Sequence, residues 1–157
     1  MVRTNAMRLL DAENIKYRTA EYEYDENDLS GVKVARSLNM PEEMLFKTLV
    51  TKGDKNGYNV FCIPVAEELD LKKAAHCTKN KKIEMLHVKD LLSVTGYIRG
   101  GCSPIGMKKK FPVFIDETAQ LFDEIGISAG IRGCQIILSP DDLLKYTNGE
   151  FVDLTAE

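Results

Sequence analysis

Three features of the 157-residue chain combine residue types and spacings that could do chemistry. The first is the loop GYIRGGCSPIGMKKKFPVFID, Gly96 to Asp116, whose glycines let the backbone approach a ligand, so that its N–H groups can bind a carbonyl oxygen or a phosphate. Glycine content alone fits a plain surface turn equally well. The loop also holds two prolines, which should make it stiff. The second feature, SAGIRG from Ser128 to Gly133, could face this loop if their strands are neighbours.

The third feature is Lys47, which stands between apolar residues in MLFKTLV. A lysine at the start of a strand is costly to bury without a partner, although it could simply face outward. The motifs GxSxG, HExxH and GxxxxGK[ST] do not occur, and GGCSPIG does not fit GxGxxG. His76 and His87 are more typical of surface or cap residues than of a general base. An enzyme with this sequence should work without a histidine triad.

The four cysteines do not have the spacing of a zinc site. Cys62, Cys77, Cys102 and Cys134 form no CxxC pair. Cys62 and Cys134 lie in apolar runs and are expected in the core. Cys102 could be reactive if Arg99 lowered its pKa, but a small side chain tolerated by the loop is the simpler interpretation. We expect no metal and no cofactor.

Charge is distributed unevenly along the chain. The net charge is −3, yet the stretch from Lys72 to Lys110 has ten Lys and Arg residues against two acids. Such a band favours oriented docking on a polyanion over general nucleic-acid affinity, although most charge runs are simply solvated faces. The lysines expected to meet RNA phosphates are Lys79, Lys81, Lys82, Lys108, Lys109 and Lys110.

The elements that must position these residues follow from hydrophobic periodicity and turn signals. Helices are expected at 4–14, 32–38, 71–77, 88–95 and 141–148, with N-caps at Ser30, Asp70 and Ser139, and a further short helix is expected near 118–123. Strands are expected at 16–25, 46–52, 58–65, 112–116, 126–130, 134–139 and 151–154, the second and third forming a hairpin across GDKNG. Hairpins without a regular βαβ rhythm predict an α+β domain. The absence of a long apolar run predicts a cytoplasmic protein that does not enter a membrane.

The segments FKTLV, TGYIRGGCSPIGMKKKFPVFID and ISAGIRGCQIILSPDDL, in this order, closely resemble the YbaK-type aminoacyl-tRNA deacylases. These are free-standing relatives of the editing domain inserted in bacterial prolyl-tRNA synthetases. The resemblance covers nearly the whole chain. It implies that residues 1–157 form a single editing domain, a mixed β-sheet or partial barrel surrounded by short helices.

The resemblance also implies an activity and a set of site residues. The implied reaction removes a wrongly attached amino acid from tRNA, typically cysteine from the tRNA for proline, and is formally a lyase reaction if the cysteine thiol cyclises. The implied catalytic residues are Lys47, Thr48 and Gly101. The implied substrate-binding residues are Tyr22, Gly100, Ser103, Pro104, Gly106, Ser128 and Gly130, with Tyr24 close enough to compete for the place of Tyr22. The implied partners are the tRNA acceptor end and a prolyl-tRNA synthetase, not DNA.

Two departures from the family leave the amino acid removed more open than the ester cleavage. Ser30 stands where relatives often have an aromatic residue, and Gln135 where some have an acid. Removal of alanine from the tRNA for proline is one alternative. A non-catalytic module that binds RNA ends or nucleotides is another.

Overall fold

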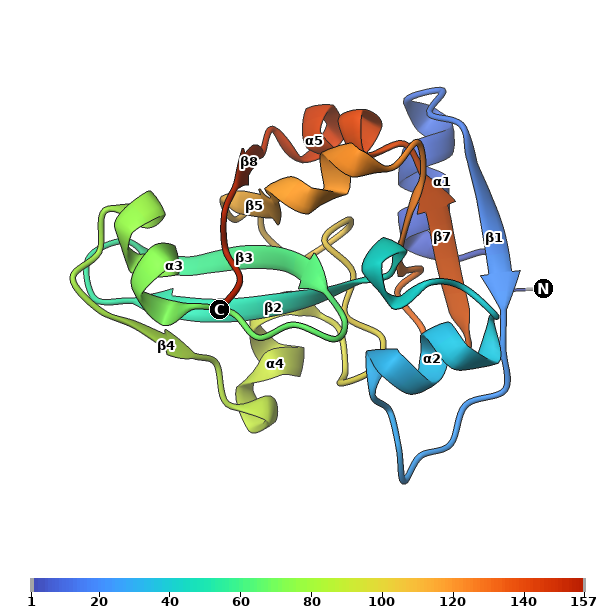
Figure 1. Ribbon diagram of the computed structural model, residues 1–157, viewed down its shortest axis with the longest axis horizontal. Coiled ribbons are helices and arrows are strands. Elements are labelled where there is room, and N and C mark those ends of the chain that lie inside the picture. The colour runs from blue at the N-terminus through green and yellow to red at the C-terminus, as the bar shows by residue number, and fades with distance from the viewer. Residues whose placement is uncertain (1, 157) are drawn as a thin grey trace.

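Two β-sheets and the short helices around them make up the protein, shown in Figure 1; the computed structural model describes residues 2–156. The strands are β1 (Tyr17–Glu21), β2 (Phe46–Gly53), β3 (Gly57–Pro64), β4 (Ile83–Met85), β5 (Val113–Asp116), β6 (Ile125–Ser128), β7 (Cys134–Leu138) and β8 (Glu150–Val152). The helices are α1 (Asn5–Ala12), α2 (Gly31–Ser37), α3 (Leu71–Thr78), α4 (Val88–Thr95) and α5 (Pro140–Thr147), with the 3-10 turns η1 (Glu42–Met44) and η2 (Glu117–Leu121).

The two sheets differ in strand direction. The smaller sheet has the order β1-β7-β6 and is antiparallel throughout. The larger has the order β4-β2-β3-β5-β8, antiparallel from β4 to β3 and parallel from β3 to β8. A bridge between Leu45 and Gly126 joins the sheets just before β2 begins. This arrangement confirms the predicted α+β class.

The predicted helix starts are confirmed by their capping bonds. Ser30 accepts from the Lys33 amide, Asp70 from two amides of the first turn of α3, and Ser139 from the Asp142 amide. These bonds satisfy N–H groups that a helix leaves unpaired at its start. Helix α5 ends at Thr147, one residue before the predicted end, and Asn148 caps it in the left-handed conformation. Strand β4 was not predicted, and its three residues are too few to show an alternating pattern.

Strand β3 separates two hydrophobic clusters. Val60 and Cys62 belong to the main core between the sheets and α1, while Phe61 and Ile63 pack under α3. Burial on both faces explains why this strand reads as a continuous apolar run. Replacing Phe61 by alanine would cost about 3–5 kcal/mol. The hairpin partner β2 is therefore held firmly, and β2 carries Lys47.

No helix in the described part of the chain is both long enough and apolar enough to cross a bilayer.

Candidate functional site

A cleft of about 410 Å³ opens over the first half of β2. Its walls come from the end of β1, the start of α2, the β4–α4 segment, the glycine loop, and the facing ends of β6 and β7. Clefts of this size hold small-molecule ligands in many proteins. The cleft brings together five of the predicted site residues: Lys47, Thr48, Tyr22, Gly100 and Ser128.

Lys47 is half-buried in this cleft and faces Ile63 across the β2–β3 ladder. Among residues 2–156, no hydrogen bond or ion pair engages its ammonium group. Burial lowers the pKa of Lys47, and the nearby Glu68 and Glu67 oppose that shift. An ammonium group held in a cleft without a partner is available to a ligand with developing negative charge.

Thr48, beside Lys47, lies 3.9 Å through its Oγ1 from the Cys62 sulfur. The Cys62 thiol is buried, which raises its pKa to about 12. Cys102 also lines the cleft, and burial raises the pKa of its thiol to about 12 as well. Both thiols therefore stay protonated at neutral pH, which favours the interpretation of Cys102 as a tolerated small side chain.

The two glycine-rich turns pack against each other, as the sequence suggested. A side chain at Gly101 would place its Cβ 3.2 Å from the Ile131 backbone, so any larger residue would push the two turns slightly apart. The Arg132 Nε donates to the Arg99 carbonyl at 2.9 Å and ties the turns together. Gly100 adopts a positive φ of 84° and lines the cleft.

Some amide groups of these turns are engaged within the protein. The Gly101 amide donates to the Ile98 carbonyl at 2.9 Å, so in this structure it is not available to a substrate oxygen, unlike the expectation for this residue. The Gly130 amide donates to the Ser128 hydroxyl at 3.1 Å. The Gly100 amide has no partner among residues 2–156, which makes it the better candidate donor in the cleft.

Three further residues of the loop lie behind the cleft and do not line it. Ser103 is fully buried, and its hydroxyl accepts from the Ile105 amide at 3.2 Å. Pro104 is buried beside it, and Gly106 turns the chain with a φ of 84°. In this structure these residues shape the loop, whereas the resemblance implied that they bind substrate.

Tyr97 supports both turns, although the sequence analysis did not single it out. Its hydroxyl donates to the Ile105 carbonyl, and burial raises its pKa to about 12. A Cβ at Gly106 would lie 2.9 Å from the Tyr97 hydroxyl, and one at Gly130 would lie 3.0 Å from its ring. The tyrosine therefore occupies the space that these glycines leave. No local pattern around Tyr97 could have indicated its contact with the distant turn at Gly130.

Gln135 forms part of the cleft wall, and its side-chain oxygen lacks a hydrogen-bond partner in the described part of the chain. The residue is only 6% exposed. A buried acceptor without a partner costs free energy, which a ligand donor would recover. Ser30 and Gly31 line the cleft as well, so both departures from the family pattern lie where a ligand would bind.

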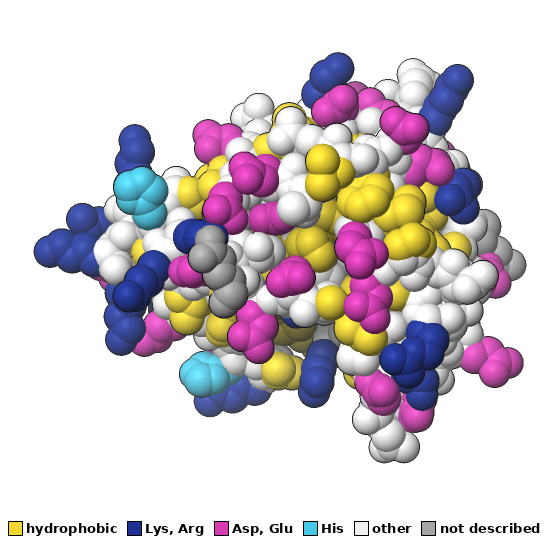
Figure 2. Space-filling model, viewed as in Figure 1, with side chains coloured by type: hydrophobic (Ala, Val, Ile, Leu, Met, Phe, Trp, Pro, Cys, Tyr) yellow, Lys and Arg dark blue, Asp and Glu magenta, His cyan; other side chains and the backbone are white. Residues whose placement is uncertain are grey.

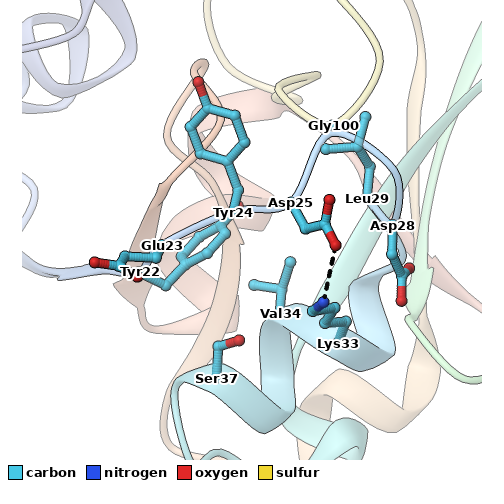
Figure 3. Close-up of a pocket in the computed structure, with 10 residues that line it drawn as sticks. All are labelled: Tyr22, Glu23, Tyr24, Asp25, Asp28, Leu29, Lys33, Val34, Ser37 and Gly100. Atoms are coloured by element: carbon cyan, nitrogen blue, oxygen red, sulfur yellow. Dashed lines mark hydrogen bonds and ion pairs between the residues drawn. The ribbon is translucent and has the colours of Figure 1, made fainter.

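A smaller pocket adjoins the cleft at the loop between β1 and α2, and Figure 3 shows Tyr22, Leu29 and Val34 among its lining residues. Its volume of about 10 Å³ holds no more than a water molecule. Asp25 and Lys33 form an ion pair of 3.4 Å across it. Tyr22 borders both cavities, whereas Tyr24 borders only this small one, so Tyr22 is the tyrosine nearer to the ligand site.

The predicted RNA-binding lysines form two separate groups. The backbone amides of Lys81 and Lys82 donate hydrogen bonds to the Asp54 side chain. Asp54 directly follows β2, and the strand between it and Lys47 is roughly 23 Å long. Lys79 ends α3 close by, and Figure 2 shows Lys and Arg side chains gathered at this end of the molecule. The second group, Lys108 to Lys110, is exposed and lies beside α4, where the Lys108 ammonium donates to the Ser93 carbonyl.

Metal-ligand clusters, histidines and carboxylates do not mark the cleft in the part of the chain that the structure describes. Within residues 2–156, no three His, Cys, Asp or Glu side chains come together as a metal site would require. His76 and His87 are exposed and line no part of the cleft. The cleft itself contains no carboxylate or imidazole side chain among its lining residues.

The chain is similar to one known protein family and to several known proteins. The family described as "Aminoacyl-tRNA editing domain" matches residues 28–146. A protein of Enterococcus faecalis named as a Cys-tRNA(Pro)/Cys-tRNA(Cys) deacylase, EbsC, is 51% identical over 155 residues, which cover 99% of this chain and 94% of the relative. A solved structure described as a trans-editing enzyme for prolyl tRNA synthetase superposes with a TM-score of 0.82 at 21% identity, over 98% of this chain and 99% of the other. The hypothetical protein APE2540 superposes with a TM-score of 0.86 at 17% identity, over 95% and 97% of the two chains.

Proposed function

Since the chain belongs to the aminoacyl-tRNA editing domain family, we propose that it is a free-standing deacylase that removes cysteine from the tRNA for proline. Residues 1–157 act as one editing domain in the cytoplasm. The name of the 51% identical relative supports the choice of cysteine. The observation that carries the proposal is the Lys47 ammonium, unpaired among residues 2–156, in a cleft that none of the described carboxylates or imidazoles lines.

The substrate itself supplies the nucleophile. The cysteine thiol attacks its own ester carbonyl, forming a carbon–sulfur bond, and the carbon–oxygen bond to the ribose then breaks. The thiol proton passes to the ribose oxygen that leaves with the tRNA. The protein needs only to hold the ester and stabilise the oxyanion that develops, which the Lys47 ammonium and the Gly100 amide can do. Thr48 packs beside this centre, and Tyr22 borders it.

The wall of the cleft opposite the strand provides a place for the amino group. The Gln135 oxygen is an acceptor without a partner, and an aminoacyl ester carries an α-ammonium group that must donate. A hydrogen bond between them would orient the ester against Lys47. The Ser128 hydroxyl, already an acceptor for the Gly130 amide, keeps one proton to donate nearby.

Affinity for the tRNA comes from the exposed lysines. The group at Lys108 lies beside the cleft wall α4, while the group at Lys79 to Lys82 would meet a more distant part of the RNA. A prolyl-tRNA synthetase that presents the mischarged tRNA is part of the proposal, since the sequence resembles domains that act with this enzyme.

The test is deacylation of four charged tRNAs by the purified protein. The tRNA for proline is charged with cysteine, alanine or proline, and the tRNA for cysteine with cysteine. Loss of the cysteine ester, without loss of the alanine or the proline ester, is the expected result. Loss of alanine alone would replace the proposal with the alternative editing reaction, and loss of none would favour a non-catalytic binding module. Cleavage of cysteine from both tRNAs would show that the protein does not distinguish the RNA without its synthetase.

A further inference from the structure

The end of the cleft away from Lys47 has an apolar rim. Met85 of β4 and Val88 of α4 line the cleft, yet they are 42% and 61% exposed. The Leu86 amide, between them in sequence, donates to the Val50 carbonyl at 3.0 Å. This bond fixes the rim to β2 three residues beyond Lys47, which is about 10 Å along a strand. Large apolar side chains left open inside a binding cleft are suited to contact with a ligand.

Cationic side chains lie in the same cleft and on or beside α4, which carries part of this rim. Arg99 lines the same cleft, Lys89 is exposed on α4, and the Lys108 ammonium is held against α4 by the Ser93 carbonyl. The acids nearby are Asp90 on α4 and Glu84 on β4, the latter paired with Lys82 at 3.4 Å. Flat apolar contact flanked by cations is the combination with which proteins bind the bases and phosphates of single-stranded nucleic acids.

We propose that Met85 and Val88 form the subsite for the base of the terminal nucleoside, while the aminoacyl group lies at Lys47. This inference rests on the proposed function, because the base belongs to the tRNA end that carries the ester. A volume of about 410 Å³ exceeds the needs of one amino acid and is of the size that encloses larger ligands. Ribose, which joins base and ester, would span the floor between Lys47 and Val50.

This subsite refines the expectation that the glycine loop holds the whole adenosine. The loop offers the Gly100 amide and little apolar area, whereas a base needs a surface on which its ring can lie. Neither Met85 nor Val88 can hydrogen-bond to a base edge, so the contact depends on ring area and favours a purine over a pyrimidine.

The first test measures the subsite directly, without any reaction. Adenosine is titrated into protein whose methionine methyl groups carry ¹³C, and the Met85 signal is identified by its loss in Met85→Ala. A ring lying on Met85 should shift this signal, and ribose at the same concentration should not. Absence of a shift with adenosine, or an equal shift with ribose, would overturn the subsite.

The second test uses the charged tRNA. The double variant Met85→Ala/Val88→Ala should raise KM for aminoacyl-tRNA about tenfold and leave kcat within a factor of about two, because the missing contact binds and does not react. Leu92→Ala is the matched control, since Leu92 is 54% exposed on α4 but does not line the cleft. An equal rise in KM for the control, or no rise in the double variant, would reject the subsite.

The two experiments separate this inference from the proposed function. A Met85 shift in a protein that deacylates none of the charged tRNAs would reject the deacylase and support the nucleoside subsite. Deacylation without a Met85 shift would support the deacylase and reject the subsite.

Discussion

Replacing Lys47 by methionine tests the proposed centre most directly. The substitution keeps the length and the apolar stem of the side chain and removes only the ammonium group. Loss of one oxyanion donor typically costs about 100- to 1,000-fold in rate, or about 2.7–4 kcal/mol of transition-state stabilisation. Lys47 has no ion pair or hydrogen bond within residues 2–156, so the folded protein should lose only the longer-range attraction of Glu68 and Glu67 and should regain the desolvation cost of the ammonium group. We therefore expect Lys47→Met to lower the rate of deacylation without lowering the stability of the protein.

The effect on stability depends on pH in a way that follows from the lowered pKa of Lys47. Burial is the main cause of that lower pKa, which means that the folded state holds the ammonium proton less tightly than the unfolded state. At pH values below the pKa of the folded state, Lys47 is charged in both the folded and the unfolded state, and folding is opposed by the desolvation of its ammonium group. As pH rises from the pKa of the folded state towards the ordinary lysine pKa of 10.5, the unfolded chain binds more protons than the folded one, so wild-type stability rises relative to the variant. Lys47→Met should thus be at least as stable as wild type at pH 7, with the difference shrinking at alkaline pH.

The assay pairs single-turnover deacylation of cysteinyl-tRNA with urea unfolding at pH 7 and pH 10. Lys52→Met is the matched control, because Lys52 lies exposed on the same strand over the Tyr58 ring. It should keep wild-type deacylation. The reasoning would be refuted by a Lys47→Met protein that deacylates at the wild-type rate, or by one that loses more than about 1 kcal/mol of stability at pH 7, which would make Lys47 a structural residue.

Three further predictions concern the surroundings of Lys47. Gly130→Ala should lower the free energy of unfolding by about 1–3 kcal/mol in urea titrations, because φ is 101° and the new Cβ meets the Tyr97 ring at 3.0 Å. Gly57→Ala, at a φ of 79° with nothing within 4 Å, should cost less; an equal loss would exclude the ring contact as a cause. Gln135→Leu should raise KM for cysteinyl-tRNA about tenfold without destabilising the protein, since it removes an unpartnered buried oxygen; an unchanged KM would contradict the proposed bond to the ammonium. Stability should fall from about pH 9 towards pH 12, because the folded thiols of Cys62 and Cys102 remain protonated while unfolded thiols ionise, and Cys102→Ala should flatten this fall in pH-dependent urea titrations.

Local patterns were sufficient to predict the elements whose signals are contained in a few neighbouring residues. The hairpin of β2 and β3, the caps at Ser30, Asp70 and Ser139, and the position of Lys47 at the start of a strand are of this kind. A cap needs one side chain and the amide two or three residues later, so the sequence contains both partners.

Features that depend on contacts distant in the sequence could not be predicted. Tyr97 reaches the Ile105 carbonyl and packs against Gly130, and β4 exists because Met85 pairs with Thr51. The engagement of the Gly101 amide by Ile98 is local, but it depends on a backbone path that glycine leaves open to many alternatives. The resemblance to editing domains implied Gly101, whereas the structure leaves the amide of the cleft-lining Gly100 without a partner among residues 2–156.

The buried thiol of Cys102 has a consequence for the proposed removal of cysteine. At neutral pH a free cysteine side chain, with a pKa near 8.5, ionises to a few per cent. The ionised fraction of a thiol with a pKa of about 12 is roughly a thousandfold smaller. Under the proposed function, the Cys102 sulfur would therefore be slow to take the acyl group from the substrate ester and slow to form a disulfide with the substrate thiol. Burial of one thiol would let it line a cleft that receives another without entering the reaction.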